Sequence, residues 1–202
     1  MSGRRGGTAF LADPPDDLRG FPSYLLQPTA SIHRIHRRDL SPWWFASDGR
    51  GRFDLVLRPG YGTCYLARTP VAGLLEVFKG IPLVPESEID ARRSFEAHFD
   101  TPLRLANACA PGAAQFGVNS ELSSGSDYQG PQRWAAAWLD AGYAGIRYFV
   151  RSDPSRSLIG YALFGPAGRG GDAVPGGSSG PIAPETLAQA ERWGLRVAPV
   201  PA

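Results

Sequence analysis

Four side chains of the kinds that do polar chemistry stand at separate places in the first half of the chain: Arg34, Arg52, Tyr65 and Glu76. Arginine forks hold phosphate or carboxylate groups through paired hydrogen bonds that lysine cannot reproduce. A carboxylate placed beside a developing positive charge stabilises it. Chemistry of this kind requires the lone acid and the two guanidiniums to converge on one shared hollow from separate elements.

Each of these residues also has an ordinary structural explanation. A helical glutamate is most often simply solvated. Surface arginines commonly pair with nearby carboxylates, here those of Asp39, Asp48 or Asp54. Whether the four side chains form a site or are ordinary surface residues therefore depends on how the elements that carry them are placed.

The spacing of apolar residues and the positions of Pro and Gly predict those elements. Residues Ser31–His36 and Tyr61–Ala67 are bounded by Pro or Gly turns, and each predicts a strand. Thr69 and Pro70 form an N-cap and N1 pair before an apolar stripe with helical spacing, which predicts a helix that ends at Gly80. The stripe consists of Val71, Leu74, Leu75 and Phe78.

Glu76 lies away from this stripe. At 100° per residue it is about 150° from the centre of the stripe, between small neighbours on the polar side of the helix. We therefore expect Glu76 to face water or a cleft.

The rest of the chain favours an α+β fold. A helix is predicted from Gly130 to Gly142, and strands over 144–151 and 157–164 are predicted to form a hairpin around Asp153. Residues 86–122 fit short helices or strands equally well. Strands and helices interleave without a regular βαβ rhythm, so we predict a single compact domain with a mixed, mainly antiparallel β core flanked by helices.

Composition divides the chain into four predicted segments: a flexible N-terminal arm (1–23), a compact domain (24–165), a Gly/Pro/Ser-rich linker (166–183), and a short C-terminal helix with its tail (184–202). The arm is expected to drape over the domain through Phe10, Leu11 and Phe21. The C-terminal helix carries an apolar face that we expect to dock back onto the domain.

Charge and motifs exclude several function classes. A net charge of +2 is too small to drive direct binding to nucleic acid, although the basic run at 33–38 followed by Trp43 and Trp44 would be the place for it. The sequence has neither a Rossmann fingerprint nor a phosphate-binding P-loop, and His33 and His36 fall on opposite strand faces, so no metal site is expected. No segment has the apolar length of a membrane span, and we expect a cytoplasmic protein.

The two cysteines, Cys64 and Cys109, lie far apart in apolar surroundings. This spacing argues against a disulfide framework or a cysteine-based metal site. We expect both to be buried thiols.

The order of several short motifs resembles the RES-domain family, named for its arginine, glutamate and serine. Residues 33–80 contain H-R-I-H-R-R-D-L-S-P-W-W-F, then G-R-F-D, then Y-G-T-C-Y-L-A-R-T-P-V-A-G-L-L-E-V-F. Residues 141–165 contain A-G-Y-A-G-I-R-Y, then R-S-D-P-S, then A-L-F-G, which resemble the closing strands of the family. The resemblance covers most of the predicted domain.

This resemblance implies a fold similar to that of ADP-ribosyltransferases and an activity that degrades NAD. The implied reaction is phosphorolysis or hydrolysis of the nicotinamide riboside bond, in toxins neutralised by a helix-turn-helix antitoxin. NAD would be the substrate, phosphate a possible co-substrate, and no resident cofactor is implied. Two alternatives stay open: an ADP-ribosyltransferase acting on a macromolecule, and a catalytically silent nucleotide-binding module.

Carried over by position, the resemblance implies a role for each of the four side chains. Glu76, Arg34 and Arg52 would be catalytic, with both arginines holding the pyrophosphate or an incoming phosphate. Tyr65 would line the nicotinamide-ribose pocket.

The family serine has no counterpart in this chain. It stands two residues after the tyrosine of the I-R-Y strand, where this sequence has Val150. Ser152 lies on the same side by parity and could substitute if the strand bulges. Arg151 offers another donor, so Arg151 and Ser152 complete the predicted substrate-binding residues.

Overall fold

An eight-stranded sheet forms the centre of the computed structural model, which describes residues 10–170 and 176–199. The strand order is β1-β7-β8-β9-β4-β2-β6-β11. The strands are β1 (Ser23–Leu26), β2 (Ile32–Arg37), β4 (Tyr61–Ala67), β6 (Arg92–Ala97), β7 (Leu103–Asn107), β8 (Gly145–Phe149), β9 (Ile159–Pro166) and β11 (Gly177–Gly180). Neighbouring strands are antiparallel except for the parallel pair β7 and β8.

Two small strand pairs and a set of short helices complete the fold. β3 (Trp44–Phe45) pairs with β10 (Gly168–Arg169), and β5 (Leu83–Pro85) runs parallel to β12 (Arg196–Ala198). The helices are α1 (Pro70–Phe78), α2 (Glu86–Asp90), the 3-10 helix η1 (Pro111–Phe116), α3 (Glu121–Ser124), α4 (Gln129–Asp140) and α5 (Pro184–Arg192). The predicted α+β class with a mainly antiparallel sheet is confirmed.

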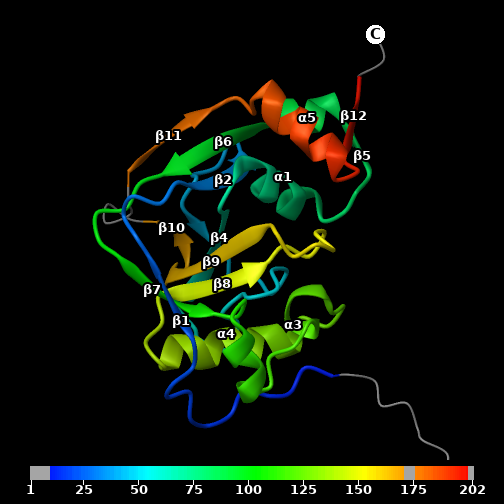
Figure 1. Ribbon diagram of the computed structural model, residues 1–202. Coiled ribbons are helices and arrows are strands. Elements are labelled where there is room, and N and C mark those ends of the chain that lie inside the picture. The colour runs from blue at the N-terminus through cyan, green and yellow to red at the C-terminus, as the bar shows by residue number, and fades with distance from the viewer. Residues whose placement is uncertain (1–9, 171–175, 200–202) are drawn as a thin grey trace, which may run out of the picture.

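The helices gather at the two ends of the sheet. Figure 1 shows α1 and α5 beside β2 and β6, and α3 and α4 beside β8 and β1. α4 buries Trp134 and Trp138 against β8, while α1 buries Leu74 and Leu75 against β2 and β4. A third apolar cluster, which includes Phe95 and Cys64, fills the opposite face. The region between α1 and α4 is where a pocket forms.

Local sequence signals determine the bounds of α1. The Thr69 side chain accepts a hydrogen bond from the Ala72 N–H at 3.3 Å, as an N-cap should. All four residues of the predicted stripe are buried. Lys79, with φ 48°, and Gly80, with φ 82°, turn the chain out of the helix in the left-handed region. The predicted helix and its end at Gly80 are confirmed.

The predicted flexible linker is wrong where the structure describes it. Residues 168–169 and 177–180 are strands, and β11 pairs with β6 at the sheet edge. Gly177 packs so closely that an added Cβ would lie 2.3 Å from the Phe95 ring and from the Glu96 carbonyl oxygen. Gly177 therefore allows close packing of β11 on β6, and the compact domain continues past residue 165. Residues 171–175 lie outside the described residues.

The predicted arm is also packed over its described part, while residues 1–9 lie outside it. Leu18 and Phe21 are buried, whereas Phe10 is 78% exposed and does not contribute to the packing as expected. The Tyr143 hydroxyl donates to the Phe21 carbonyl, and the indole N–H of Trp134 donates to Ala12. These contacts secure the segment against α4.

The C-terminal half of the chain forms the predicted supersecondary elements. β8 and β9 make the expected hairpin, and α5 docks onto α1 as predicted. Residues 86–122, which fitted helices and strands equally well in the sequence, form α2, β6, β7 and η1, and α3 begins at Glu121.

Both cysteines are free thiols, with Cys64 buried as expected and Cys109 only partly buried. Among the described helices, none combines the length and hydrophobicity needed to cross a bilayer.

Candidate active site

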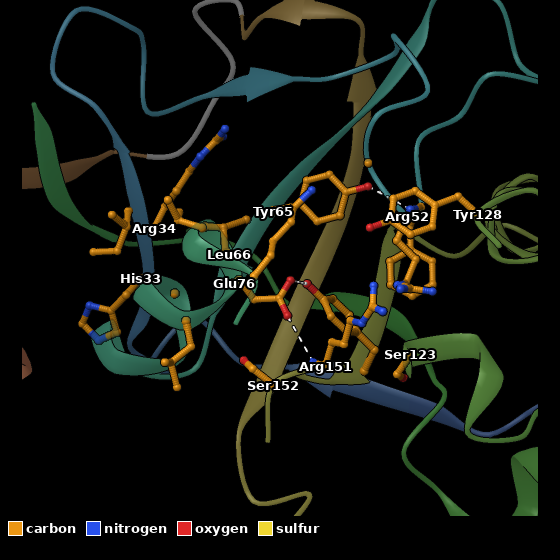
Figure 2. Close-up of a pocket in the computed structure, with 18 residues that line it drawn as sticks. His33, Arg34, Arg52, Tyr65, Leu66, Glu76, Ser123, Tyr128, Arg151 and Ser152 are labelled. Atoms are coloured by element: carbon orange, nitrogen blue, oxygen red, sulfur yellow. Dashed lines mark hydrogen bonds between the residues drawn. The ribbon is translucent and has the colours of Figure 1, made fainter. Parts of the chain in front are cut away.

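A cavity of about 290 Å³ opens between α1, β4, the end of β8 and α3. Its lining includes all six predicted site residues: Arg34, Arg52, Tyr65, Glu76, Arg151 and Ser152. These residues come from β2, the turn at Gly51, β4, α1 and the turn after β8 (Figure 2). The convergence expected from the sequence therefore occurs for most of the set.

Glu76 lies at the centre of the cavity wall. Its Oε2 accepts a hydrogen bond from the Tyr148 hydroxyl at 3.1 Å, and its Oε1 accepts one from the Arg151 backbone N–H at 3.4 Å. Burial raises the pKa of Glu76, and the two hydrogen bonds and the charges of Arg52 and Lys79 act in the opposite direction. The expectation that Glu76 faces a cleft is met.

Arg52 is a buried cation with unused hydrogen-bonding capacity. The residue is only 8% exposed, and burial lowers the pKa of its guanidinium. Nη2 donates to the Gly125 carbonyl at 2.7 Å, and Cζ lies 4.5 Å from the centroid of the Tyr128 ring. Nη1 is buried and has no hydrogen-bond partner. An unpartnered donor of a buried cation is suited to an anionic ligand.

A tight turn holds Arg52 in place. Asp54 is fully buried, and its carboxylate accepts from the N–H groups of Gly49 and Gly51 and from the Tyr65 hydroxyl at 2.8 Å. A Cβ at Gly51 would lie 2.2 Å from Asp54 Oδ1 and 2.5 Å from the Tyr65 oxygen, so only glycine fits. Burial, the Asp54 charge and the hydrogen bond raise the pKa of Tyr65 well above its ordinary value, which keeps the phenol protonated. Tyr65 thus both lines the pocket and fixes the turn.

The prediction that Arg34 converges with Arg52 and Glu76 is wrong. Arg34 borders the cavity, but its guanidinium turns away from Glu76 (Figure 2). Nη1 donates to the carbonyls of Pro42 and Trp44 at 2.7 and 3.1 Å and contacts Cys64 Sγ. Because neighbouring residues of a strand face opposite ways, Cys64 marks the sheet face opposite the one that Tyr65 lines.

Ser152 reaches the pocket by a route that the sequence did not indicate. Val150, at the position of the expected serine, is 1% exposed and packs in the apolar cluster around α1. The strand ends at Phe149 and the chain turns at Arg151 and Ser152, so a bulge is not needed. The Ser152 Oγ is buried against the cavity without a hydrogen-bond partner.

Among the pocket residues that were not predicted as site residues, Tyr128, Tyr148 and Ser123 carry hydroxyl groups. The Tyr148 ring packs on Phe53 with centroids 4.8 Å apart. Gly160 on β9 makes room for it, since a Cβ there would lie 2.4 Å from the ring. No local pattern distinguishes these residues from core aromatics, because the partners that turn them into pocket walls are distant in sequence.

The arrangement combines one carboxylate with several donors. Among the described residues that line this cavity, Glu76 is the single carboxylate, and two buried donors, Arg52 Nη1 and Ser152 Oγ, have no hydrogen-bond partner. The described residues contain no cluster of three or more His, Cys, Asp or Glu side chains able to hold a metal ion. Such a site can hold an anion beside a carboxylate that faces a developing positive charge.

Comparisons with known proteins concern the family and the fold of the chain. The family model described as "RES domain" matches residues 31–183. A chain from the crystal structure of the M. tuberculosis MbcT-MbcA toxin-antitoxin complex has a similar fold, with a TM-score of 0.58 and 15% sequence identity. The similarity covers 84% of this chain and 91% of that chain. No curated protein matches the sequence.

Proposed function

The chain belongs to the RES-domain family, and on that premise we propose that it consumes NAD by breaking the bond between nicotinamide and ribose. The observation that carries this proposal is the single buried carboxylate of Glu76, set in a pocket whose other functional groups are hydrogen-bond donors. Ordinary glycosidases need two carboxylates, one of which protonates the leaving group. The nicotinamide of NAD is already cationic and leaves as a neutral ring, so one carboxylate suffices.

In this proposal Glu76 faces the ribose. As the nicotinamide departs, positive charge develops on the ring oxygen and anomeric carbon, and an ionised carboxylate stabilises it. Tyr148 and the Arg151 N–H hold both carboxylate oxygens, so Glu76 does not have to reorient during the reaction. Tyr65 lines the part of the pocket beside Glu76 and would border the nicotinamide and its ribose.

The unpartnered donors would bind the oxygens of the substrate. Arg52 Nη1 is suited to a phosphate oxygen, either of the diphosphate or of an incoming phosphate. Ser152 Oγ would take part in the same binding from the opposite wall. Phosphate or water would be the acceptor, and the products distinguish them, because phosphorolysis gives a phosphorylated ADP-ribose and hydrolysis gives free ADP-ribose.

The biological role that fits this activity is that of a toxin held in check by a protein antitoxin. Support comes from the family match and from the fold shared with a chain of a toxin-antitoxin complex. We propose that the antitoxin is a helix-turn-helix protein encoded nearby and that the toxin acts on the cytoplasmic NAD pool. Growth arrest on expression, relieved when the neighbouring gene is co-expressed, would be the expected behaviour.

The direct test incubates the purified protein with NAD and measures free nicotinamide. The expected result is nicotinamide release that depends on enzyme concentration, without label from NAD appearing on a macromolecule. Label on protein or nucleic acid would instead identify an ADP-ribosyltransferase. Absence of nicotinamide release with and without phosphate would leave a silent binding module and refute the proposal.

Tyr148→Phe should shift the pH dependence of the reaction. Cleavage needs ionised Glu76, so the rate falls as the pH drops through the pKa of this group, which burial raises above 4.5. The Tyr148 hydrogen bond lowers that pKa, and removing it raises the pKa further. The acid limb of the kcat profile should therefore move to higher pH. Tyr143→Phe, which removes a buried hydroxyl bonded to Phe21, is the control; an unmoved limb in Tyr148→Phe would rule out this role.

A further inference from the structure

A second cavity, of about 480 Å³, adjoins the first. Its walls come from η1, the loop before α3, the end of β8 and the turn that follows β8. Ser123 and Arg151 line both cavities and so form their shared wall, and Figure 2 shows Arg151 beside Glu76 with Ser123 beyond it. The two cavities are therefore adjacent at Ser123 and Arg151.

The free charges of the second cavity are positive. Arg151 and Arg156 line it, and neither forms an ion pair with a described residue. The one carboxylate in its lining is that of Asp153, and hydrogen bonds within the turn 153–158 engage it. Asp153 accepts hydrogen bonds from the backbone and side chain of Ser155, from those of Ser157, and from the Leu158 N–H. The cavity is therefore suited to an anionic ligand.

Arg156 is held in an uncommon conformation. Its φ of 55° lies in the left-handed region, where residues other than glycine are rare. Its guanidinium lies 5.6 Å from the centroid of the Phe149 ring, another residue of the cavity lining. Backbone strain of this kind is concentrated at binding sites. The pair presents a planar cation and an aromatic ring next to the cavity.

We propose that the second cavity binds the adenosine monophosphate half of NAD, with the diphosphate crossing the shared wall at Ser123 and Arg151. This inference rests on the proposed function. A dinucleotide has two nucleosides joined by a diphosphate, which calls for two adjacent cavities with a cation at their junction. Arg156 and Phe149 offer a surface on which a base can stack, and the two arginines offer forks for phosphate. In this assignment Arg151 and Arg156 bind the diphosphate, which is the role that Arg34 was expected to have.

A binding experiment tests the second cavity without any turnover. AMP is titrated by calorimetry into the full-length protein, the Arg156→Gly variant and the control Arg169→Ala. Glycine adopts the left-handed conformation freely, so Arg156→Gly removes the guanidinium and keeps the turn. Arg169 is an exposed arginine that lines neither cavity. AMP should bind the unaltered protein and Arg169→Ala equally and Arg156→Gly about tenfold more weakly. AMP binding that is absent, or unchanged in Arg156→Gly, would overturn the proposal.

A kinetic comparison separates this site from general damage. Nicotinamide mononucleotide contains the reacting bond but lacks the adenosine monophosphate half. Arg156→Gly should raise KM for NAD about tenfold and change KM for the mononucleotide less than about twofold. Equal increases for both substrates would contradict the assignment. Failure of the proposed function is recognised separately, since the unaltered protein would then release no nicotinamide from NAD whatever AMP does.

Discussion

Glu76→Gln should lower kcat for NAD consumption by at least about 10³-fold while leaving the fold intact. The amide keeps the shape of the side chain, and its one carbonyl oxygen can accept from the Arg151 N–H while its NH2 group donates to the Tyr148 hydroxyl oxygen. It loses the negative charge that would stabilise the developing cation, which is the largest single electrostatic contribution in the proposed reaction. Nicotinamide release measures the loss, and circular dichroism checks the fold. Glu185→Gln, an exposed change on α5, serves as the matched control.

The same substitution should also raise Tm at neutral pH. Because burial raises the pKa of Glu76 in the folded state, ionising the group costs free energy of folding at any pH above its unfolded value of about 4.5. The amide removes this cost, so the gain should be present at pH 7 and disappear below the unfolded pKa, where both states are protonated. A residue that destabilises the protein while it is charged is retained for function rather than for packing. Full activity in Glu76→Gln would exclude the proposed role of this carboxylate.

Arg52→Lys should reduce kcat/KM about 100-fold, whereas Arg34→Lys should mainly reduce stability. Lysine at position 52 retains a charge but loses the fork that bonds Gly125 with one nitrogen and leaves the other facing the pocket. Lysine at position 34 cannot reproduce the contacts of Nη1 with the carbonyls of Pro42 and Trp44. Leaving such carbonyls without a donor costs about 1–3 kcal/mol.

Steady-state kinetics and thermal unfolding of the two variants separate these roles. We expect a large change in kcat/KM with a small change in Tm for Arg52→Lys, and the reverse for Arg34→Lys. Arg38→Lys, a substitution of an exposed arginine just after β2, controls for the loss of guanidinium chemistry at the surface. If Arg34→Lys impaired NAD turnover as strongly as Arg52→Lys without loss of stability, the face assigned to Arg34 would be incorrect.

Local signals in the sequence determined the elements that carry the site. The Thr69 cap, Pro70 and the apolar stripe specify α1, and the same periodicity places Glu76 on the side away from the core. Strand β4 has the predicted bounds, Tyr61–Ala67, because the strand signal and its flanking turns are contiguous in the chain. Information of this kind acts over a few residues, so a single sequence contains it.

Tertiary structure alone decided which side chains share the pocket. Alternation along β2 makes Arg34 point opposite to its neighbours, but which face of the sheet carries the cavity depends on where α1, α3 and α4 pack. Ser152 reaches the cavity because β8 stops at Phe149, and Tyr128 reaches it because α4 packs on β8. Gly177 belongs to a strand because it pairs with Ala97 of β6, 80 positions earlier. Contacts between residues so far apart in the chain are made by packing, which local periodicity does not encode.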